Sequence, residues 1–307
     1  MKKHASHSPI FSESPSGVLV QTGSSSAFTM QASSSYLAIK QRGLELQELY
    51  RKNGLTIPPT SYMAKLIEDT TTLSDAWLCN DQSRATAFHL FSASQLDRVA
   101  TAALPLDVSI RSKEFLSALL CGSLDLLGRE RSKAKDTLWE LELWQQLIRM
   151  DMHATLEEPD IVVSFDGARI GIACKKFYSE KNVSKVLSQA VAQFETEFDF
   201  GIIAINLDDL TPENTILKAG SLEQLLKMIN QVNYSFIKKH DWHLRKYLEP
   251  GRAISVLVST AVIADVPTAK PRFLNSRQST VWNIPGLPVD KEKQMRNFFN
   301  AANAAHA

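Results

Sequence analysis

An acidic residue and a lysine flank two short apolar segments in the middle of the chain. Asp160 precedes the run Ile161–Phe165, and Lys175 closes the run Arg169–Lys175. Asp166-Gly167, between the two runs, is typical of a two-residue hairpin turn, because glycine accepts the positive φ that such turns require. A carboxylate can hold a divalent cation, and a nearby lysine can orient or deprotonate a water or stabilise charge on a phosphate. The hairpin therefore carries the groups that metal-assisted hydrolysis needs.

Strand alternation decides which of two adjacent lysines belongs to this centre. Successive side chains of a strand point to opposite faces. Lys175 therefore shares a face with Gly171 and Ala173, whose small side chains leave room for a substrate. Lys176 follows the opposite, apolar face. We assign the catalytic role to Lys175; the alternative is that both lysines form only a solvated strand end.

These residues resemble the PD-(D/E)XK nuclease superfamily, which has the restriction endonuclease-like fold. Pro159-Asp160 stands at the PD of the family pattern. Ala173-Cys174-Lys175 stands at (D/E)-X-K, with alanine in place of the acid. The resemblance covers about residues 136–207 and implies a glutamate on the preceding helix and a glutamine on the following one. It also implies Mg²⁺ (or Mn²⁺) as a cofactor and nucleic acid, DNA or RNA, as the substrate.

The preceding helix offers two glutamates. Asp136 is the expected N-cap of a helix over 138–150. Apolar side chains form a broad face of this helix, at about 100° per residue, centred near Glu140. Glu142 is expected on the opposite, polar face with Gln145 and Arg149. A carboxylate within a buried face is costly unless it is paired or metal-bound, so Glu140 is the predicted family glutamate. The alternative is a solvated Glu140 in a frayed first turn.

The remaining site residues follow from the resemblance. Asp160 and Glu140 are the predicted metal ligands, and Glu158, in the loop before Pro159, is a third acid that could replace the one missing at Ala173. Gln193 lies at the edge of the apolar stripe of a helix expected from Ser179 to about Phe198, where the family's glutamine would position a water or phosphate. The predicted nucleic-acid contacts, which could equally be solvated charges, are Lys176, Lys181 and Lys185.

Composition limits the class of protein. The chain has 307 residues, 44% of them hydrophobic, which is enough for a sizeable core. The net charge is +1, so nucleic-acid binding would require a local basic patch rather than a global field. Cys79, Cys121 and Cys174 are dispersed and make no zinc spacing. No run of about 18 apolar residues occurs. We expect a cytoplasmic protein that does not bind a membrane.

The predicted architecture is an α/β fold with a mixed central sheet flanked by helices, preceded by a small helical domain. Residues 1–35 are a flexible Ser-rich tail, with 17–21 as a candidate edge strand; 36–130 form the helical domain, and 131–307 the α/β domain. The helical domain is expected to contain helices over 36–52, 61–78, 82–103 and 113–127. Further strands are expected at 200–207, 254–263 and 281–284, helices at 222–245 and 290–302, and a loop around 275–279.

Two functions follow from these patterns. The first is a metal-dependent nuclease that hydrolyses phosphodiester bonds of DNA or RNA. The second is a catalytically silent nuclease-like module that binds nucleic acid or a partner protein, which the alanine at position 173 favours. The helical domain is a candidate surface for a homodimer or for a protein partner.

Overall fold

The structure is a computed structural model that describes residues 10–13, 19–22, 35–194, 198–248, 253–270, 272–283 and 287–304. Its α-helices are α1 (Tyr36–Lys52), α2 (Tyr62–Leu78), α3 (Ala87–Ala103), α4 (Ile110–Leu119), α5 (Lys133–Arg149), α6 (Val183–Ala192), α7 (Leu222–Leu248) and α8 (Val289–Ala304). Its strands are β1 (Ile10–Glu13), β2 (Leu19–Thr22), β3 (His153–Thr155), β4 (Ile161–Phe165), β5 (Ala168–Lys176), β6 (Phe200–Asn206), β7 (Leu217–Lys218), β8 (Ala253–Asp265) and β9 (Phe273–Asn283). This mixed α/β arrangement, with its helical part N-terminal, confirms the predicted fold class.

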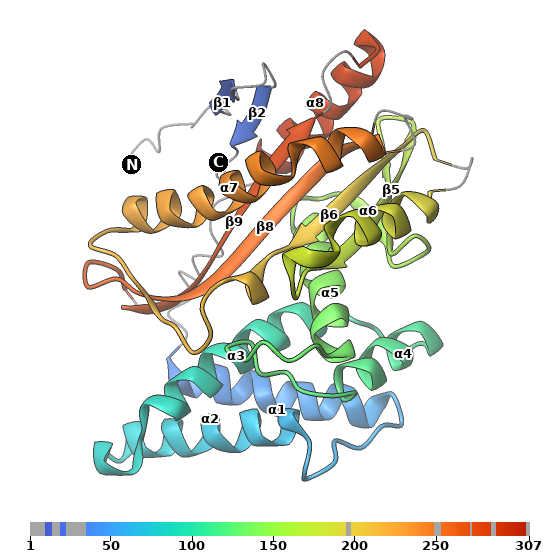
Figure 1. Ribbon diagram of the computed structural model, residues 1–307. Coiled ribbons are helices and arrows are strands. Elements are labelled where there is room, and N and C mark those ends of the chain that lie inside the picture. Colours follow the sequence, from blue (N-terminus) through green and yellow to red (C-terminus); the bar gives the residue numbers. More distant parts are fainter. Residues whose placement is uncertain are drawn as a thin grey trace, which may run out of the picture.

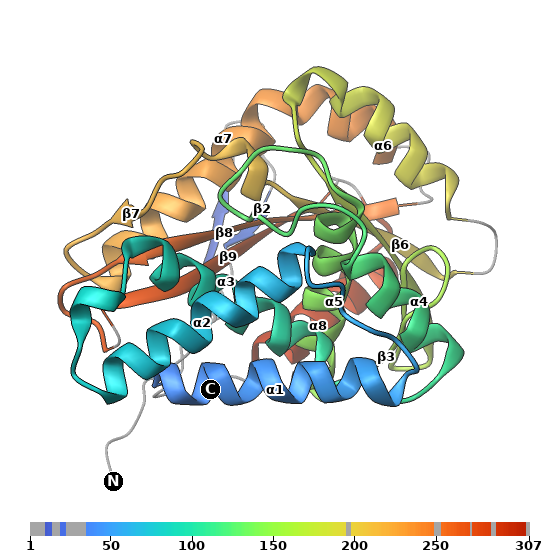
Figure 2. The same cartoon turned by 90° about the horizontal axis from the view of Figure 1, so that it is seen from below.

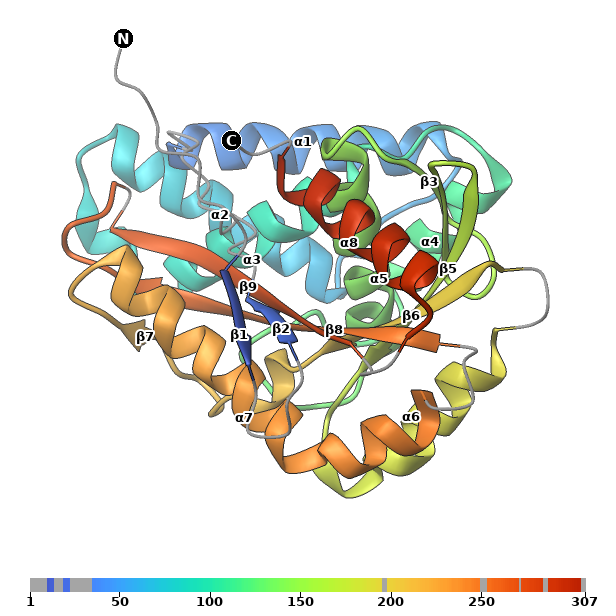
Figure 3. The same ribbon diagram turned by 90° about the horizontal axis from the view of Figure 1, so that it is seen from above.

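The described strands form one mixed sheet. Its order is β1-β2-β9-β8-β6-β5-β4-β3, with β7 beside β8. The pairs β5–β6 and β6–β8 are parallel, and α6 and α7 are the crossover helices that parallel neighbours require. Both crossovers pack on one face of the sheet, and α5 and α8 pack on the other (Figures 1 and 3). The sheet is therefore covered on both faces, which suits its nearly continuous apolar central strands.

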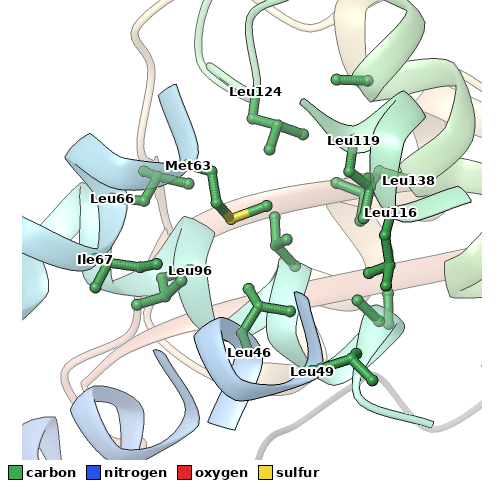
Figure 4. Close-up of a cluster of buried hydrophobic side chains, with 14 of the residues drawn as sticks. Leu46, Leu49, Met63, Leu66, Ile67, Leu96, Leu116, Leu119, Leu124 and Leu138 are labelled. Carbon is green, nitrogen blue, oxygen red and sulfur yellow. The ribbon is translucent and has the colours of Figure 1, made fainter. Parts of the chain in front are cut away.

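The helical part packs directly against α5. Helices α1 to α4 share one apolar cluster, which includes Leu46, Leu66 and Leu96, and Leu138 of α5 belongs to the same cluster (Figure 4). Seen from below, α1 and α2 lie on the opposite side of the strands from α6 and α7 (Figure 2). The boundary predicted at residue 130 therefore separates two parts that share a buried helix.

Helix α5 is buried on two sides, which the sequence pattern did not predict. It begins at Lys133, one turn before the expected start, because Ser132 rather than Asp136 caps it, with Ser132 Oγ accepting from the Ala134 N–H at 3.1 Å. Glu142 and Gln145, expected on a polar face, are both buried, with Glu142 only 6% exposed. The expectation was wrong because that side of α5 faces α3 and β9 rather than water.

The β4–β5 hairpin has the predicted form. Asp166 and Gly167 have φ of 50° and 77°, the positive values of the favoured two-residue turn. The strands pair from Phe165 with Ala168 at the turn to Ile161 with Ile172 at the far end. This register fixes which side chains share a face, so it positions the candidate site at the end remote from the turn.

Several predicted boundaries differ from the structure. Helix α4 ends at Leu119 and α6 at Ala192, both earlier than expected. The segment 275–279, predicted as a loop because it is polar, lies within β9, where its side chains are buried against polar partners such as Ser259 and Glu142. Within the predicted tail, β1 and β2 pair with each other, and β2 adds an edge to β9.

Candidate active site

Asp160 and Lys175 meet at the end of the hairpin remote from the turn. Asp160 Oδ2 accepts the Cys174 N–H at 2.6 Å and a hydrogen bond from Lys175 Nζ at 3.2 Å. Lys175 Nζ also donates to the Cys174 carbonyl oxygen at 3.1 Å. The Lys175 side chain remains 18% exposed, so the pair is reachable from solvent. The sequence prediction that Asp160, Ala173 and Lys175 gather at one end of a strand pair is confirmed.

Glu140 lies close enough to interact with both of these charges. Burial raises the pKa of its carboxyl to about 8, the negative charge of Asp160 adds to that rise, and Lys175 opposes it. Burial likewise raises the pKa of Asp160, against the opposing effects of Lys175 and the Cys174 N–H. Two carboxyls that each favour protonation form a site that gains from a nearby cation.

Gln193 caps the C-terminus of α6 and reaches the loop before Asp160. Its Nε2 donates to the Pro159 carbonyl oxygen at 2.9 Å. Its Oε1 is buried and has no hydrogen-bond partner among the described residues. A buried amide oxygen of this kind is an acceptor available to a water or a hydroxyl group. Gln193 therefore lies beside the centre, as the resemblance implies.

Ala173 has no exposed surface. It belongs to the apolar cluster formed with α6 and α7, which includes Leu187 and Ala190. By the hairpin register it is one step beyond the pair Ile161–Ile172, and so lies across from Asp160. A carboxylate at position 173 would thus be buried under α6 next to Asp160, where burying a charge is costly unless it is paired.

The three predicted metal-binding acids do not form one cluster. Among the described residues no group of three or more His, Cys, Asp or Glu side chains is arranged to hold a metal ion. Glu158 is exposed, because it lies in the loop before Pro159 and its side chain points to solvent. Asp160 and Glu140 remain as a pair, and one or two carboxylates suffice for Mg²⁺, which keeps several waters and takes further oxygens from a substrate phosphate. The donor set fits that ion.

Lys176 was wrongly predicted to contact nucleic acid. Its side chain is 3% exposed, and its Nζ lies 2.5 Å from Asp209 Oδ2 and 2.8 Å from Asn206 Oδ1. Lys135, which is fully buried, binds the other oxygen of Asp209 at 3.1 Å. The charge of Lys176 is thus used inside the protein, at the carboxyl ends of β5 and β6. In contrast, Lys181 and Lys185 are exposed.

A cluster of four charges, three of them buried and Arg98 partly buried, was missed by the sequence analysis. Glu142 of α5 accepts hydrogen bonds from Arg98 of α3 and, at 2.6 Å, from Arg277 of β9. Arg98 also binds Asp208, whose pKa stays below its usual range because the two arginines outweigh the effect of burial. The position of Asp208 close after β6 is the sequence feature that could have indicated its role. No feature of the sequence around Arg98 distinguishes this residue from a surface arginine.

Replacing Glu140 with glutamine is expected to remove a pH-dependent loss of stability. The unfolded carboxyl ionises near its ordinary pKa of 4.5, whereas the folded one stays protonated up to about 8. Between pH 4.5 and about pH 8 the folded state therefore binds more protons than the unfolded state. The contribution of Glu140 to stability falls as the pH rises through this range and stays constant above it. At about pH 8 without metal, Glu140→Gln should be more stable than the wild type by up to a few kcal/mol.

The measurement is urea unfolding in EDTA across this pH range. Glu158→Gln, the same substitution at an exposed glutamate, is the control and should follow the wild-type curve within about 0.5 kcal/mol. A Glu140→Gln curve parallel to the wild-type curve at all pH values would contradict the raised pKa.

Comparisons with known proteins supply no family for the chain. No protein-family model matches it, and no similar sequence is found among curated proteins. No helix among the described residues has the length and apolar character needed to cross a membrane.

Proposed function

We propose that this protein is a metal-dependent nuclease of the PD-(D/E)XK type that hydrolyses phosphodiester bonds, with DNA as the expected substrate. The observation that carries the proposal is the convergence of Asp160, Lys175 and Glu140 at the end of the β4–β5 hairpin. The order α5, β3, β4–β5 hairpin, α6 and β6 supports it, because the resemblance implies a helix, strands with a hairpin, a second helix and a further strand.

Each side chain has a chemical role in this proposal. Asp160 and Glu140 would hold Mg²⁺ (or Mn²⁺), which supplies Lewis acidity toward a phosphoryl oxygen. Lys175, 3.2 Å from Asp160, orients or deprotonates the attacking water and offsets charge that develops on the phosphate. Gln193 offers its unpaired Oε1 to hold a water in place. Lys181 and Lys185 are exposed cations able to contact the phosphate backbone.

Cleavage by the purified protein tests the proposal. Supercoiled DNA, linear DNA and RNA are incubated with Mg²⁺ or Mn²⁺ and with EDTA. Wild-type protein should cleave at least one of them only when the metal is present, and Asp160→Asn should lower the rate by about a hundredfold or more. Asp166→Asn is the matched control, because the same substitution in the turn at the far end of the hairpin should leave the rate unchanged.

The second candidate is a silent module that binds nucleic acid without cutting it. The observation that favours it is Ala173, which stands where the family pattern has an acid. The side chains around Ala173 are apolar and supply no acid in its place. Metal-independent binding of nucleic acid by wild-type protein, with no cleavage under any of these conditions, would support this reading and exclude the nuclease.

Restoring the acid at position 173 separates the two candidates further. Ala173→Glu should lower the stability of the metal-free protein by about 1–3 kcal/mol, because it buries a carboxylate beside Asp160. Mg²⁺ or Mn²⁺ should recover part of this loss and should bind more tightly than to the wild type. Thermal melts with and without metal measure both effects. Gain of cleavage only in Ala173→Glu would identify a silent site, and a melting temperature independent of metal would contradict a metal site here.

A further inference from the structure

The outer side of α7 combines cationic side chains with an exposed tryptophan. The inward side of this helix is buried, whereas Lys238, Trp242 and Lys246 are exposed. Their spacing of four residues places them in one row along the helix. Trp242 is 67% exposed, an unusual position for the largest apolar side chain.

The Trp242 ring is held by neighbours and still reachable. Lys246 Nζ lies 5.5 Å from the centroid of this ring and 5.4 Å from that of Tyr247. The His243 and Trp242 rings make an edge-to-face contact with 5.0 Å between ring centroids. These contacts limit the motion of the indole while most of its surface stays in solvent. A fixed, exposed π-face is the feature on which an unpaired base can stack.

Helix α6 extends the same surface. Ser184 Oγ and Tyr247 Oη lie 2.9 Å apart, and Glu180, just before α6, binds Lys239 at 2.6 Å and His240 at 2.8 Å. Helices α6 and α7 thus lie side by side on one face of the sheet (Figure 3). The exposed Lys181 and Lys185 of this segment have no ion pair within the described residues.

Charge gathers on this surface although the chain as a whole is nearly neutral. Segments 180–185 and 238–246 contain six lysine and arginine side chains and two carboxylates, whereas the whole chain has a net charge of +1. The two carboxylates, Glu180 and Asp241, are each engaged in an ion pair. The surface therefore attracts polyanions without the help of a global basic field.

We infer that the α6–α7 surface, defined by Lys181, Lys185, Lys238, Trp242 and Lys246, binds a single-stranded segment of nucleic acid. The lysines contact phosphates, and Trp242 stacks on an unpaired base, whose π-face a duplex would not present. An acidic protein would use the lysines but gain less from an exposed indole. Lys181 lies just before α6, and the residue that caps the other end of this helix, Gln193, contacts Pro159 beside the candidate active site. The inference deepens the proposed function and rests on nucleic acid being the substrate.

Binding is measured without cleavage. A fluorescein-labelled oligo(dT) of about 20 nucleotides is titrated with protein in EDTA, and anisotropy reports the Kd. Trp242→Ala should raise the Kd about tenfold. Lys238→Gln combined with Lys246→Gln should weaken binding and reduce the salt slope of log K by about 1.4, because each lost phosphate contact on a single strand is worth about 0.7.

Matched controls exclude a general effect of surface substitution. Trp77→Ala removes another exposed tryptophan, on α2, and Lys227→Gln removes an exposed lysine at the start of α7. Both should bind oligo(dT) like the wild type. Equal Kd values of wild type and Trp242→Ala for oligo(dT) would overturn the inference. So would binding of a DNA duplex or of poly-glutamate that is as tight as binding of oligo(dT) and that Trp242→Ala does not weaken. The binding titration contains EDTA and does not depend on cleavage. Absence of cleavage in the separate assay with Mg²⁺ or Mn²⁺ would therefore contradict the proposed nuclease activity but not binding at the α6–α7 surface.

Discussion

Lys175→Met is expected to lower nucleic-acid cleavage by a factor of about 10² or more while the protein stays folded. The substitution removes the only cation hydrogen-bonded to Asp160 among the described residues, and with it the group proposed to act on the water and on the phosphate charge. General acid–base and electrostatic contributions of this kind have that magnitude. The Lys175 and Asp160 side chains are only 18% and 17% exposed, so the loss of this ion pair should cost more than that of a surface pair but less than that of a fully buried one, about 1–2 kcal/mol.

Lys176→Met is the matched comparison, one residue later in the same strand. Here the expected effect is on folding, because the lost ammonium leaves Asp209 buried with Lys135 as its remaining cation. Removing one partner of a buried pair costs about 3 kcal/mol or more. Turnover at saturating Mg²⁺, measured well below both melting temperatures, should fall only for Lys175→Met, whereas the melting temperature should fall further for Lys176→Met than for Lys175→Met. Equal loss of turnover in both would mean that strand alternation does not separate their roles.

Strand alternation explains why this part of the site could be predicted from the sequence. Side chains on β5 alternate between the two covered faces of the sheet. This alternation alone places the two lysines on opposite faces, where Lys175 lies beside Asp160 and Lys176 beside Asp209. The Asp166-Gly167 turn fixed the register by local chemistry, without help from the rest of the chain. Strand alternation could not predict the partner of Lys176. Asp209 lies in the short helical turn 208–210 that follows β6, and its carboxylate pairs with a lysine that the sequence indicated to be solvated.

Helix α5 shows where sequence periodicity is insufficient. A polar stripe predicts a solvent-facing side, and this rule placed Glu142 and Gln145 in water. The rule fails when another part of the protein covers that stripe with charges of opposite sign. Arg98, 44 residues earlier, and Arg277, 135 residues later, supply those charges, and no local pattern links them to α5. The same reasoning applies to β9, whose polar residues resemble a loop until their buried partners are known.

Glu142→Gln is therefore expected to be strongly destabilising, by about 3–5 kcal/mol. The cluster of Arg98, Arg277, Glu142 and Asp208 is balanced, and removing one carboxylate leaves an uncompensated positive charge between α3, α5 and β9. Urea unfolding at about pH 7–8 in EDTA measures the loss. Glu140→Gln is the control: the same substitution two residues earlier in the same helix should stabilise the protein under these conditions, since the pKa of Glu140 is raised to about 8.

A second substitution tests whether charge balance is the cause. Adding Arg277→Gln to Glu142→Gln removes one charge of each sign, so Arg98 and Asp208 remain as a balanced pair. The double variant should lose less stability than the sum of the two single variants, with a coupling of about 1–3 kcal/mol. Additive losses would mean that Glu142 acts through packing alone. A loss below about 1 kcal/mol for Glu142→Gln would mean that this side of α5 is solvated, as the periodicity of the sequence first indicated.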